Sequence, residues 1–254
     1  MKLCDILIVC ENIAPKALAY DYDNVGLIVG TLKDDINKVL VALDCTLPVI
    51  EEAIEFGADM IITHHPLLTS PVKRILPDMP ETMAVFRLIK NNIGHIAMHT
   101  NLDCACYGVN DCIAESLELV NTEAVGVDGL ARIGELESPM TLYELSIHVE
   151  EKLSTKVRVC GEAGRIIKSV AVIGGSGGSC VSQMQALGAD VLITGEMKHS
   201  QAIDAMHLGL CAIVAGHFET ETIVLKSLVR RLQNQTNGVQ YKLAVSNRTP
   251  LWSI

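Results

Sequence analysis

The sequence predicts an α/β fold made of two similar halves, each with a helix-covered sheet. Three observations lead to this prediction. Short runs rich in β-branched residues alternate with segments of helical periodicity, which is typical of sheets whose strands are joined by helices. One seven-residue motif occurs twice. Polar side chains follow several of the predicted strands, at the position where open α/β sheets bind ligands.

The apolar pattern locates the elements along the chain. Short apolar runs bounded by polar or glycine-containing segments indicate strands, and apolar residues three or four apart indicate helices. The predicted strands cover residues 39–44, 60–63, 95–99, 169–173, 191–194, 210–215 and 241–245. The predicted helices cover residues 49–56, 81–91, 109–117, 142–153, 181–187 and 222–233.

The repeated motif is Gly-Ala-Asp followed by a strand. Residues 57–63 read GADMIIT and residues 188–194 read GADVLIT. Each copy has an upstream strand, a preceding helix and a downstream strand that leads to a histidine, His99 or His217. This order predicts two βαβαβ halves. A chance match is the alternative, since Gly-Ala-Asp before a strand is common in α/β proteins.

The boundary between the halves is expected near residue 125. Residues 121–130 are rich in glycine and small side chains, and residues 135–139 mark a second break. The first lobe is therefore predicted to span residues 1–125, completed by the C-terminal segment 215–254. The second lobe is predicted to span residues 126–214.

Composition bounds the class of protein. The chain has 254 residues, of which 49% are hydrophobic and 20% charged, a globular composition with room for substantial cores. No apolar run approaches the roughly 18 residues that span a bilayer. Asp5 and Glu11 interrupt the apolar N-terminal stretch, so no secretory signal is expected. Nine cysteines without a CxxC pair favour reduced thiols and a cytoplasmic protein.

The net charge of −10 argues against nucleic acid and anionic lipid as partners, because such binding depends on lysine and arginine displacing counterions. Arg230-Arg231 is a candidate basic patch. At the end of a predicted helix, however, a basic pair is more commonly a favourable C-terminus.

Two adjacent histidines follow the strand at residues 60–63. Neighbouring side chains on an extended segment point to opposite sides, so His64 and His65 can serve two metal ions. Alternatively, both imidazoles hydrogen-bond to backbone groups at a polar strand end.

Two further strand ends carry imidazole or carboxylate groups. His99 and Asp103 follow one strand, where Asp103 can ligate a metal or instead cap the next helix, and His99 can relay a proton. His217 and Glu221 follow another strand and lie four residues apart, so a helix beginning there presents both on the same side.

Together these side chains predict a metal site. Imidazole and carboxylate suit Zn, Fe, Mn, Ni or Co, and the five ligands His64, His65, Asp103, His217 and Glu221 are about what two divalent ions require if positions stay open for water or substrate. Cys104 and Cys106 invite a soft-metal interpretation, although Cys-x-Cys beside a helix start is usually packing.

A glycine-rich segment, residues 174–179, lies between a predicted strand and a predicted helix. Its amides suit a phosphate group. The segment matches neither a Walker motif nor the complete dinucleotide fingerprint, and such turns are more commonly structural.

The ordered set of motifs resembles the GTP cyclohydrolase I type 2 homolog family, also called the NGG-interacting factor three-like proteins. The matching motifs span nearly the whole chain. They are Asp23-Asn24-Val25-Gly26-Leu27, Thr63-His64-His65-Pro66, His99-Thr100-Asn101-Leu102-Asp103, Gly174-Gly175-Ser176-Gly177, Thr194-Gly195-Glu196 with His199, and Gly216-His217-Phe218-Glu219-Thr220-Glu221.

The resemblance implies a two-metal site between the two halves. It assigns His64 and Asp103 to one ion, His65 and His217 to the other, and Glu221 to a bridging position. It also implies a homohexamer with metal sites facing an internal cavity.

This sequence departs from the family pattern in two ways. It is too short for the domain that longer bacterial members carry between the halves. Ser200 replaces a histidine that commonly follows the one matched by His199, which leaves His199 a modest role near the metals or the substrate. Asp23 and Asn24 either position a ligand or simply form a turn before Gly26.

The leading functional hypothesis is a metal-dependent hydrolase that acts on a nucleotide or a related small molecule, with His99 as the proton shuttle. GTP ring opening is the activity for which the family is named. The rival hypothesis is a metal-stabilised oligomer that acts through protein partners without catalysis. A third, a nuclease or phosphodiesterase, is disfavoured by the acidic charge.

Overall fold

The computed structural model describes residues 1–32, 34–126 and 129–251. Within these ranges the chain forms two compact units. The first comprises residues Met1–Ala105 and Val224–Arg248, and the second comprises residues Cys106–Ile223 together with the described residues from Thr249. Val127 and Asp128 of the predicted linker, and residues 252–254 of the predicted C-terminal segment, lie outside the described residues.

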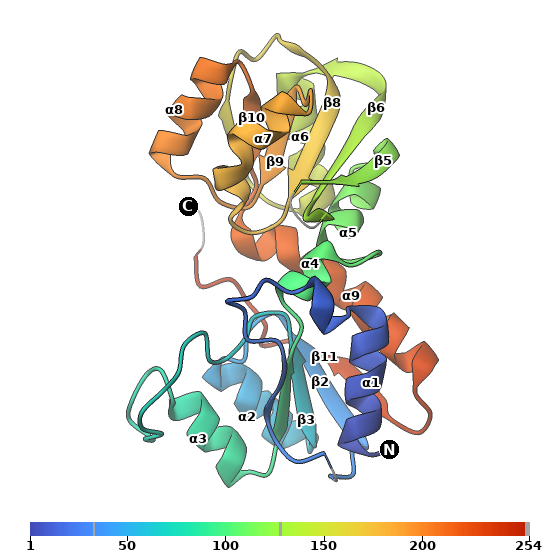
Figure 1. The fold of residues 1–254 in the computed structure, drawn as a ribbon, viewed down its shortest axis with the longest axis vertical. Helices are drawn as coiled ribbons and strands as arrows, with labels where there is room; N and C mark the ends of the chain where they lie inside the picture. Colours follow the sequence, from blue (N-terminus) through green and yellow to red (C-terminus); the bar gives the residue numbers. More distant parts are fainter. Residues whose placement is uncertain (33, 127–128, 252–254) are drawn as a thin grey trace. The chain divides into compact units, whose positions relative to one another are not determined.

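The first unit contains a five-stranded sheet in the order β1-β4-β3-β2-β11 (Figure 1). The last four strands run parallel, and β1 pairs antiparallel with β4. β3 and β4 are buried throughout, which explains why they read in the sequence as continuous apolar runs. The strands are β1 (Gly26–Val29), β2 (Lys38–Ala42), β3 (Met60–Thr63), β4 (Gly94–Ala97) and β11 (Gln240–Leu243).

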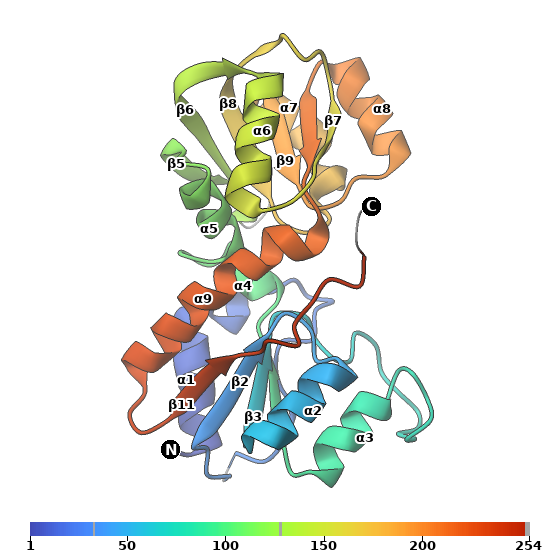
Figure 2. The same ribbon diagram turned by 180° about the vertical axis from the view of Figure 1, so that it is seen from behind.

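Helices cover both faces of this sheet. α2 and α3 lie on one face and α1 on the other, as the two opposite views show (Figures 1 and 2). Thr46 caps α2 by accepting a hydrogen bond from the Val49 amide, and Gly57 ends the helix in a left-handed conformation with φ +69°. The helical elements of this unit are α1 (Leu3–Ile13), η1 (Lys16–Leu18), α2 (Leu47–Phe56), α3 (Met83–Lys90), α4 (Thr100–Cys104) and the second part of α9 (His217–Gln235).

The second unit contains a six-stranded sheet in the order β5-β6-β8-β9-β10-β7. Its centre, β8-β9-β10, is parallel, and the remaining strands pair antiparallel. α6 covers one face and α7 the other (Figures 1 and 2). The strands are β5 (Val120–Val125), β6 (Ala131–Thr141), β7 (Arg158–Cys160), β8 (Ile166–Ile173), β9 (Val191–Thr194) and β10 (Cys211–Val214). The helices are α5 (Val109–Ser116), α6 (Leu142–Leu153), η3 (Gly177–Cys180), α7 (Val181–Ala186), α8 (His199–Leu208) and the start of α9.

The repeated motif performs the same structural task in both units. In the first, Asp59 Oδ2 accepts hydrogen bonds from the amides of Asn37 and Lys38 at the start of β2. In the second, Asp190 Oδ2 accepts them from the amides of Lys168 and Ser169 in β8. Each aspartate thus aligns two parallel strands. The predicted pair of similar α/β halves is confirmed.

All predicted strands and helices form, with ends shifted by a few residues, except that α9 begins five residues earlier than expected, at His217 instead of residue 222. The sequence pattern did not predict the N-terminal helix, the antiparallel strands β1, β5, β6 and β7, or the helices α4 and α8. The segment read as a linker and a break, residues 121–139, largely forms β5 and β6. α5 and β5 therefore belong to the second unit, whereas the prediction placed them in the first lobe.

No helix in the described part of the chain combines the length and the apolar character that crossing a bilayer requires.

Candidate metal centre

The adjacent histidines lie where β3 ends. The amides of His64 and His65 continue the parallel ladder by donating to the carbonyls of Ala42 and Leu43, at 3.3 and 2.9 Å. The backbone bends at these residues instead of remaining extended. The two rings therefore do not point to opposite sides as predicted. Their centroids are 5.0 Å apart.

His64 is fully buried, and both of its ring nitrogens face acceptors. Nδ1 lies 2.8 Å from the carbonyl oxygen of Met98, at the end of β4. Nε2 lies 3.5 Å from Oδ1 of Asp103 in α4. A backbone carbonyl on Nδ1 fixes the ring orientation and leaves Nε2 as the metal-binding nitrogen, as is usual for histidine ligands.

The two neighbouring imidazoles each contact a carboxylate through Nδ1. His65 Nδ1 lies 2.7 Å from Asp44 Oδ1, just past the end of β2. His99 Nδ1 lies 3.0 Å from Asp23 Oδ1. In both residues the carboxylate accepts the Nδ1 hydrogen, so Nε2 carries a lone pair.

Asp23 is anchored by its own hydrogen bonds. The amide and hydroxyl of Thr100 donate to Oδ2, at 3.0 and 2.5 Å. Burial favours a higher pKa for Asp23, but the hydrogen bonds from His99 and Thr100 outweigh it and hold the pKa far below its usual range. Asp23 is therefore a permanent anion behind His99. These contacts favour a functional role for Asp23 over the alternative that it simply forms a turn.

Three imidazoles converge in the first unit. His64, His65 and His99 each offer a ring nitrogen, and these nitrogens all lie within 4.8 Å of one another. The ring of His99 packs edge-on against both neighbours, at centroid distances of 5.1 and 5.4 Å. We call His64, His65 and His99 the histidine group. It contains no cysteine, so the soft-metal interpretation of Cys104 and Cys106 gains no support.

Asp103 joins this group from α4. Asp103 lies inside α4, and the helix that follows it, α5, has Gly108 as its N-cap residue without a side-chain cap. The capping interpretation of Asp103 is therefore wrong. Its carboxylate instead faces Nε2 of His64.

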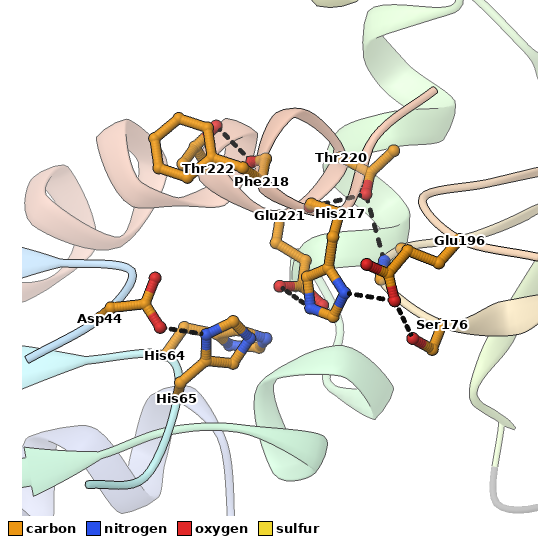
Figure 3. A network of polar contacts seen from close by, with 12 residues as sticks. Asp44, His64, His65, Ser176, Glu196, His217, Phe218, Thr220, Glu221 and Thr222 are labelled. Atoms are coloured by element: carbon orange, nitrogen blue, oxygen red, sulfur yellow. Dashed lines mark hydrogen bonds and ion pairs between the residues drawn. The ribbon is translucent and has the colours of Figure 1, made fainter. Parts of the chain in front are cut away.

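The second unit presents His217 and Glu221 from the first turns of α9. Nε2 of His217 lies 3.0 Å from Oε2 of Glu221, a contact that the four-residue helical spacing makes possible (Figure 3). Glu221 is almost completely buried. Gly216, with φ +93°, turns the chain sharply from β10 into the helix.

Glu196 is a partner of His217. It belongs to the motif Thr194-Gly195-Glu196, but no role was predicted for it from the sequence. Its Oε2 lies 3.4 Å from Nδ1 of His217 and accepts a hydrogen bond from Ser176 Oγ at 2.8 Å (Figure 3). The hydrogen bond from Ser176 is the largest cause of a lowered pKa for Glu196, and His217 adds to it. A carboxylate thus contacts Nδ1 of His217, as it does in His65 and His99.

The glycine-rich segment is packed against this pair. A Cβ on Gly175 would lie 2.1 Å from Oε1 of Glu221, and the residue has φ +57°. The amides of Gly174, Gly175 and Gly177 donate to the side chains of Asn110, Thr220 and Thr194, respectively. Because these amides are already used within the protein, the structural interpretation of the segment is favoured over a phosphate cradle.

The donor separations fit metal binding. Two donors bound to one ion at about 2.1 Å lie roughly 3.0 to 3.4 Å apart for angles of roughly 90 to 110°. The His64–Asp103 and His217–Glu221 pairs, at 3.5 and 3.0 Å, are close to this range. Nitrogen and oxygen donors without sulfur suit first-row divalent ions. These residues can hold a metal ion.

His199 belongs neither to the histidine group nor to the His217–Glu221 pair. It is exposed at the first residue of α8, and no hydrogen bond or ion pair joins it to another described side chain. Asp44 was missed altogether. Its position at the end of a predicted strand, beside the strand that carries His65, is the signal that could have identified it.

Comparison with known proteins supports the resemblance seen in the motifs. The chain matches the family model described as Duf34/NIF3 (NGG1p interacting factor 3) over residues 1–250. A Clostridium acetobutylicum protein named GTP cyclohydrolase 1 type 2 homolog is 36% identical over 259 residues, covering 99% of this chain and 94% of that protein. A Clostridium perfringens protein of the same name is 37% identical over 249 residues, covering 94% of each.

Solved structures show the same fold. Staphylococcus aureus hypothetical protein SA1388 superposes with a TM-score of 0.94 at 31% identity, covering 100% of this chain and 99% of that one. Reduced HcgD from Methanocaldococcus jannaschii superposes with a TM-score of 0.84 at 31% identity, covering 96% and 97%. The predicted resemblance and fold class are both confirmed.

Proposed function

Because the chain belongs to the Duf34/NIF3 family, we propose that it is a metal-dependent hydrolase acting on a nucleotide or a related small molecule. The observation that carries this proposal is the histidine group. Three ring nitrogens lie within 4.8 Å of one another, and each imidazole has its Nδ1 bound to a carboxylate or a carbonyl. Such outer partners orient His64 and His65 for metal binding and hold His99 in position for proton transfer.

We propose two divalent ions, drawn from Zn, Fe, Mn, Ni and Co. His64 and Asp103 hold one ion, His65 and His217 hold the other, and Glu221 bridges them. The family resemblance supplies this assignment, and the separation of the donors in each unit is compatible with it. That both units contribute to a single centre stays a prediction.

The chain's own residues supply the proton transfer. When bound, the two ions supply Lewis acidity and bring a water molecule close to neutral pKa. Asp23 holds the Nδ1 hydrogen of His99, so Nε2 accepts a proton and Asp23 stabilises the imidazolium that forms. This role requires the anionic Asp23 that Thr100 maintains.

A cavity in the segment that follows His65 supports a small-molecule substrate. The segment between β3 and α3, which begins directly after His65, encloses about 760 Å³, a volume suited to a small molecule. Lys73, Arg74 and Glu81 lie on its wall, and the two cationic side chains can pair with an anionic group such as phosphate. The relatives' name points to GTP as the first nucleotide to test.

We further propose a homo-oligomer, with a hexamer as the expected form, in the cytoplasm. Apolar side chains exposed on α8, among them Ile203 and Met206, are compatible with contacts between subunits. All nine cysteines lie in the described part of the chain, and none of them forms a disulfide there, which fits a reducing compartment. Light scattering of the purified protein measures the number of subunits.

The test combines elemental analysis with a hydrolysis screen that includes GTP. His64→Ala and Glu221→Gln are expected to reduce metal content and turnover together, whereas His99→Gln should retain the metal and lower turnover by about a hundredfold or more. His207→Ala, at an exposed histidine of α8, is the matched control.

The rival function makes different predictions for the same variants. For a metal-stabilised interaction protein, Glu221→Gln lowers the melting temperature and metal content, and no preparation hydrolyses any compound in the screen. That result, obtained with fully metal-loaded protein, would overturn the hydrolase proposal.

A further inference from the structure

Tyr22 is an exposed aromatic side chain in the turn that follows η1. Its exposed fraction is 76%, although its ring forms a pair with Tyr20 at a centroid distance of 5.6 Å and an interplanar angle of 40°. The pair belongs wholly to the first unit. One face of a large ring is therefore supported, and most of its surface is open to solvent.

The turn that carries Tyr22 is tied to the histidine group. The Tyr20 amide donates to Thr100 Oγ1 at 3.1 Å, and the Asp23 amide donates to the Tyr20 carbonyl at 2.9 Å. Thr100 in turn donates to Asp23, whose other oxygen accepts from His99. Tyr22 thus lies within a turn whose hydrogen bonds lead through Thr100 and Asp23 to the His99 imidazole.

Tyr22 directly precedes Asp23, the residue whose carboxylate contacts His99 Nδ1 at 3.0 Å. Burial, followed by the charges of Asp23 and Asp103, raises the pKa of Tyr22 above the usual value. Asp103 is the residue whose carboxylate lies 3.5 Å from His64 Nε2. The aromatic ring therefore lies at the edge of the proposed reaction site.

The same turn also borders the cavity between β3 and α3. Nδ2 of Asn24 donates to the carbonyl of Leu68 at 2.7 Å, and Leu68 lines that cavity. The turn that carries Tyr22 is therefore hydrogen-bonded to the histidine group through Asp23 and to the wall of the cavity through Asn24.

We infer that Tyr22 is the side chain on which the planar heterocyclic ring of the substrate stacks. This inference rests on the proposed function and narrows its substrate class to ring-containing compounds. An aromatic face binds any nucleobase by stacking, with little dependence on its hydrogen-bonding pattern. A ring held in advance in a fixed turn loses little conformational entropy on binding.

A second exposed tyrosine provides the matched control. Tyr143 is 62% exposed at the start of α6 in the second unit, and its backbone contacts Ala163, not a candidate ligand. Exposed aromatic residues are common on protein surfaces, so the comparison separates the position of Tyr22 from the mere presence of a tyrosine.

Calorimetric titration of metal-loaded protein with guanosine 5′-monophosphate and with ribose 5-phosphate tests the inference. Tyr22→Ala is expected to weaken binding of the nucleotide by about five- to a hundredfold, the effect of losing one stacked base. Binding of ribose 5-phosphate and metal content should stay unchanged. Tyr22→Phe keeps the aromatic face and should bind the nucleotide within about twofold of the parent, as should Tyr143→Ala.

The outcomes separate this inference from the proposed function. Nucleotide binding that depends on Tyr22, without hydrolysis of any compound, upholds the stacking role and overturns only the hydrolase proposal. Equal nucleotide affinity in the parent and Tyr22→Ala, equal losses for both ligands, or no binding of the nucleotide by the parent overturns the stacking role. Hydrolysis measured independently in the screen is unaffected by those results.

Discussion

The carboxylate of Asp44 lies 2.7 Å from Nδ1 of His65, across the ends of two neighbouring parallel strands. This contact fixes the orientation of the imidazole before any ligand binds. Removing such an outer partner typically reduces metal affinity by about ten- to a hundredfold. We predict a loss of this size for Asp44→Ala, measured by competition with a chelating dye.

The conservative variant sharpens that prediction. Asp44→Asn retains an oxygen that can accept the Nδ1 hydrogen and should give an intermediate affinity, while Asp204→Asn, at an exposed position on α8, should have no effect. Unchanged affinity in Asp44→Ala would show that the contact does not support metal binding.

Gly175→Ala is predicted to damage the second set of ligands. The new Cβ would lie 2.1 Å from Glu221 Oε1, and alanine is strained at φ +57°. We expect a loss of roughly 1 to 3 kcal/mol in the free energy of unfolding, together with reduced metal content. Chemical denaturation and elemental analysis measure the two effects.

Gly164→Ala is the control for that substitution. A Cβ at Gly164 meets no atom within 4 Å, and its φ lies outside the strained range. Its stability should equal that of the parent or rise slightly. If both alanine variants behave alike, close packing against Glu221 is not the reason for glycine at position 175.

Glu52 predicts a pH dependence of stability remote from the candidate ligands. Burial favours a higher pKa, but hydrogen bonds from Lys242 and from Ser246 outweigh it and lower the pKa of Glu52 to about 2. In the unfolded chain the pKa of Glu52 is near 4.5. The stabilisation is therefore complete above pH 4.5 and is lost as the pH falls toward 2. We expect Glu52→Gln to remove about 1 kcal/mol at pH 7 and to flatten this acid limb in urea titrations.

The neighbouring Glu55 provides the matched variant, since it is exposed on the same helix. Glu55→Gln should leave the acid limb unchanged. An acid limb of equal depth in Glu52→Gln and the parent would contradict the role given to Glu52.

His95 predicts a second pH dependence, at higher pH. The residue is fully buried in β4 and lies 2.8 Å from Thr63 Oγ1, and burial lowers its pKa to about 4. The unfolded chain binds the proton near pH 6.5 and the folded one does not. The contribution of His95 to the free energy of unfolding is therefore complete above pH 6.5. It is lost as the pH drops to 4, by up to ~3 kcal/mol.

His95→Gln should remove that component, because glutamine does not titrate. Urea unfolding of metal-free protein at pH 7.5 and 4.5 measures it without interference from metal loss. His207→Gln, at an exposed histidine, should retain the full difference between the two pH values. If His95→Gln and the parent show the same difference in unfolding free energy between pH 7.5 and 4.5, the pH dependence comes from other groups.

The central elements of both units follow from local pattern. Parallel strands buried on both faces, such as β3 and β9, are short apolar runs, and Gly57 and Gly188 mark the turns before them. One antiparallel edge strand, β5, was missed because it is polar. β5 is exposed along most of its length, so its residues resemble a loop in the sequence.

The candidate ligands were predictable for a related reason. His64 and Asp103 follow the neighbouring parallel strands β3 and β4 of the first sheet, and His217 follows the parallel strand β10 of the second, so local order alone indicates where these side chains emerge. Their identity as imidazole and carboxylate then indicates the chemistry.

The sequence by itself thus determined the two similar α/β halves and the residue types at their strand ends. The tertiary structure decided which carboxylate holds which imidazole. Asp23 and His99 are 76 residues apart, and Asp44 and His65 are 21 apart. Such pairs depend on the register of neighbouring strands and on the turn before Asn24, and hydrophobic periodicity does not encode these relationships because it reports only the burial of each side chain.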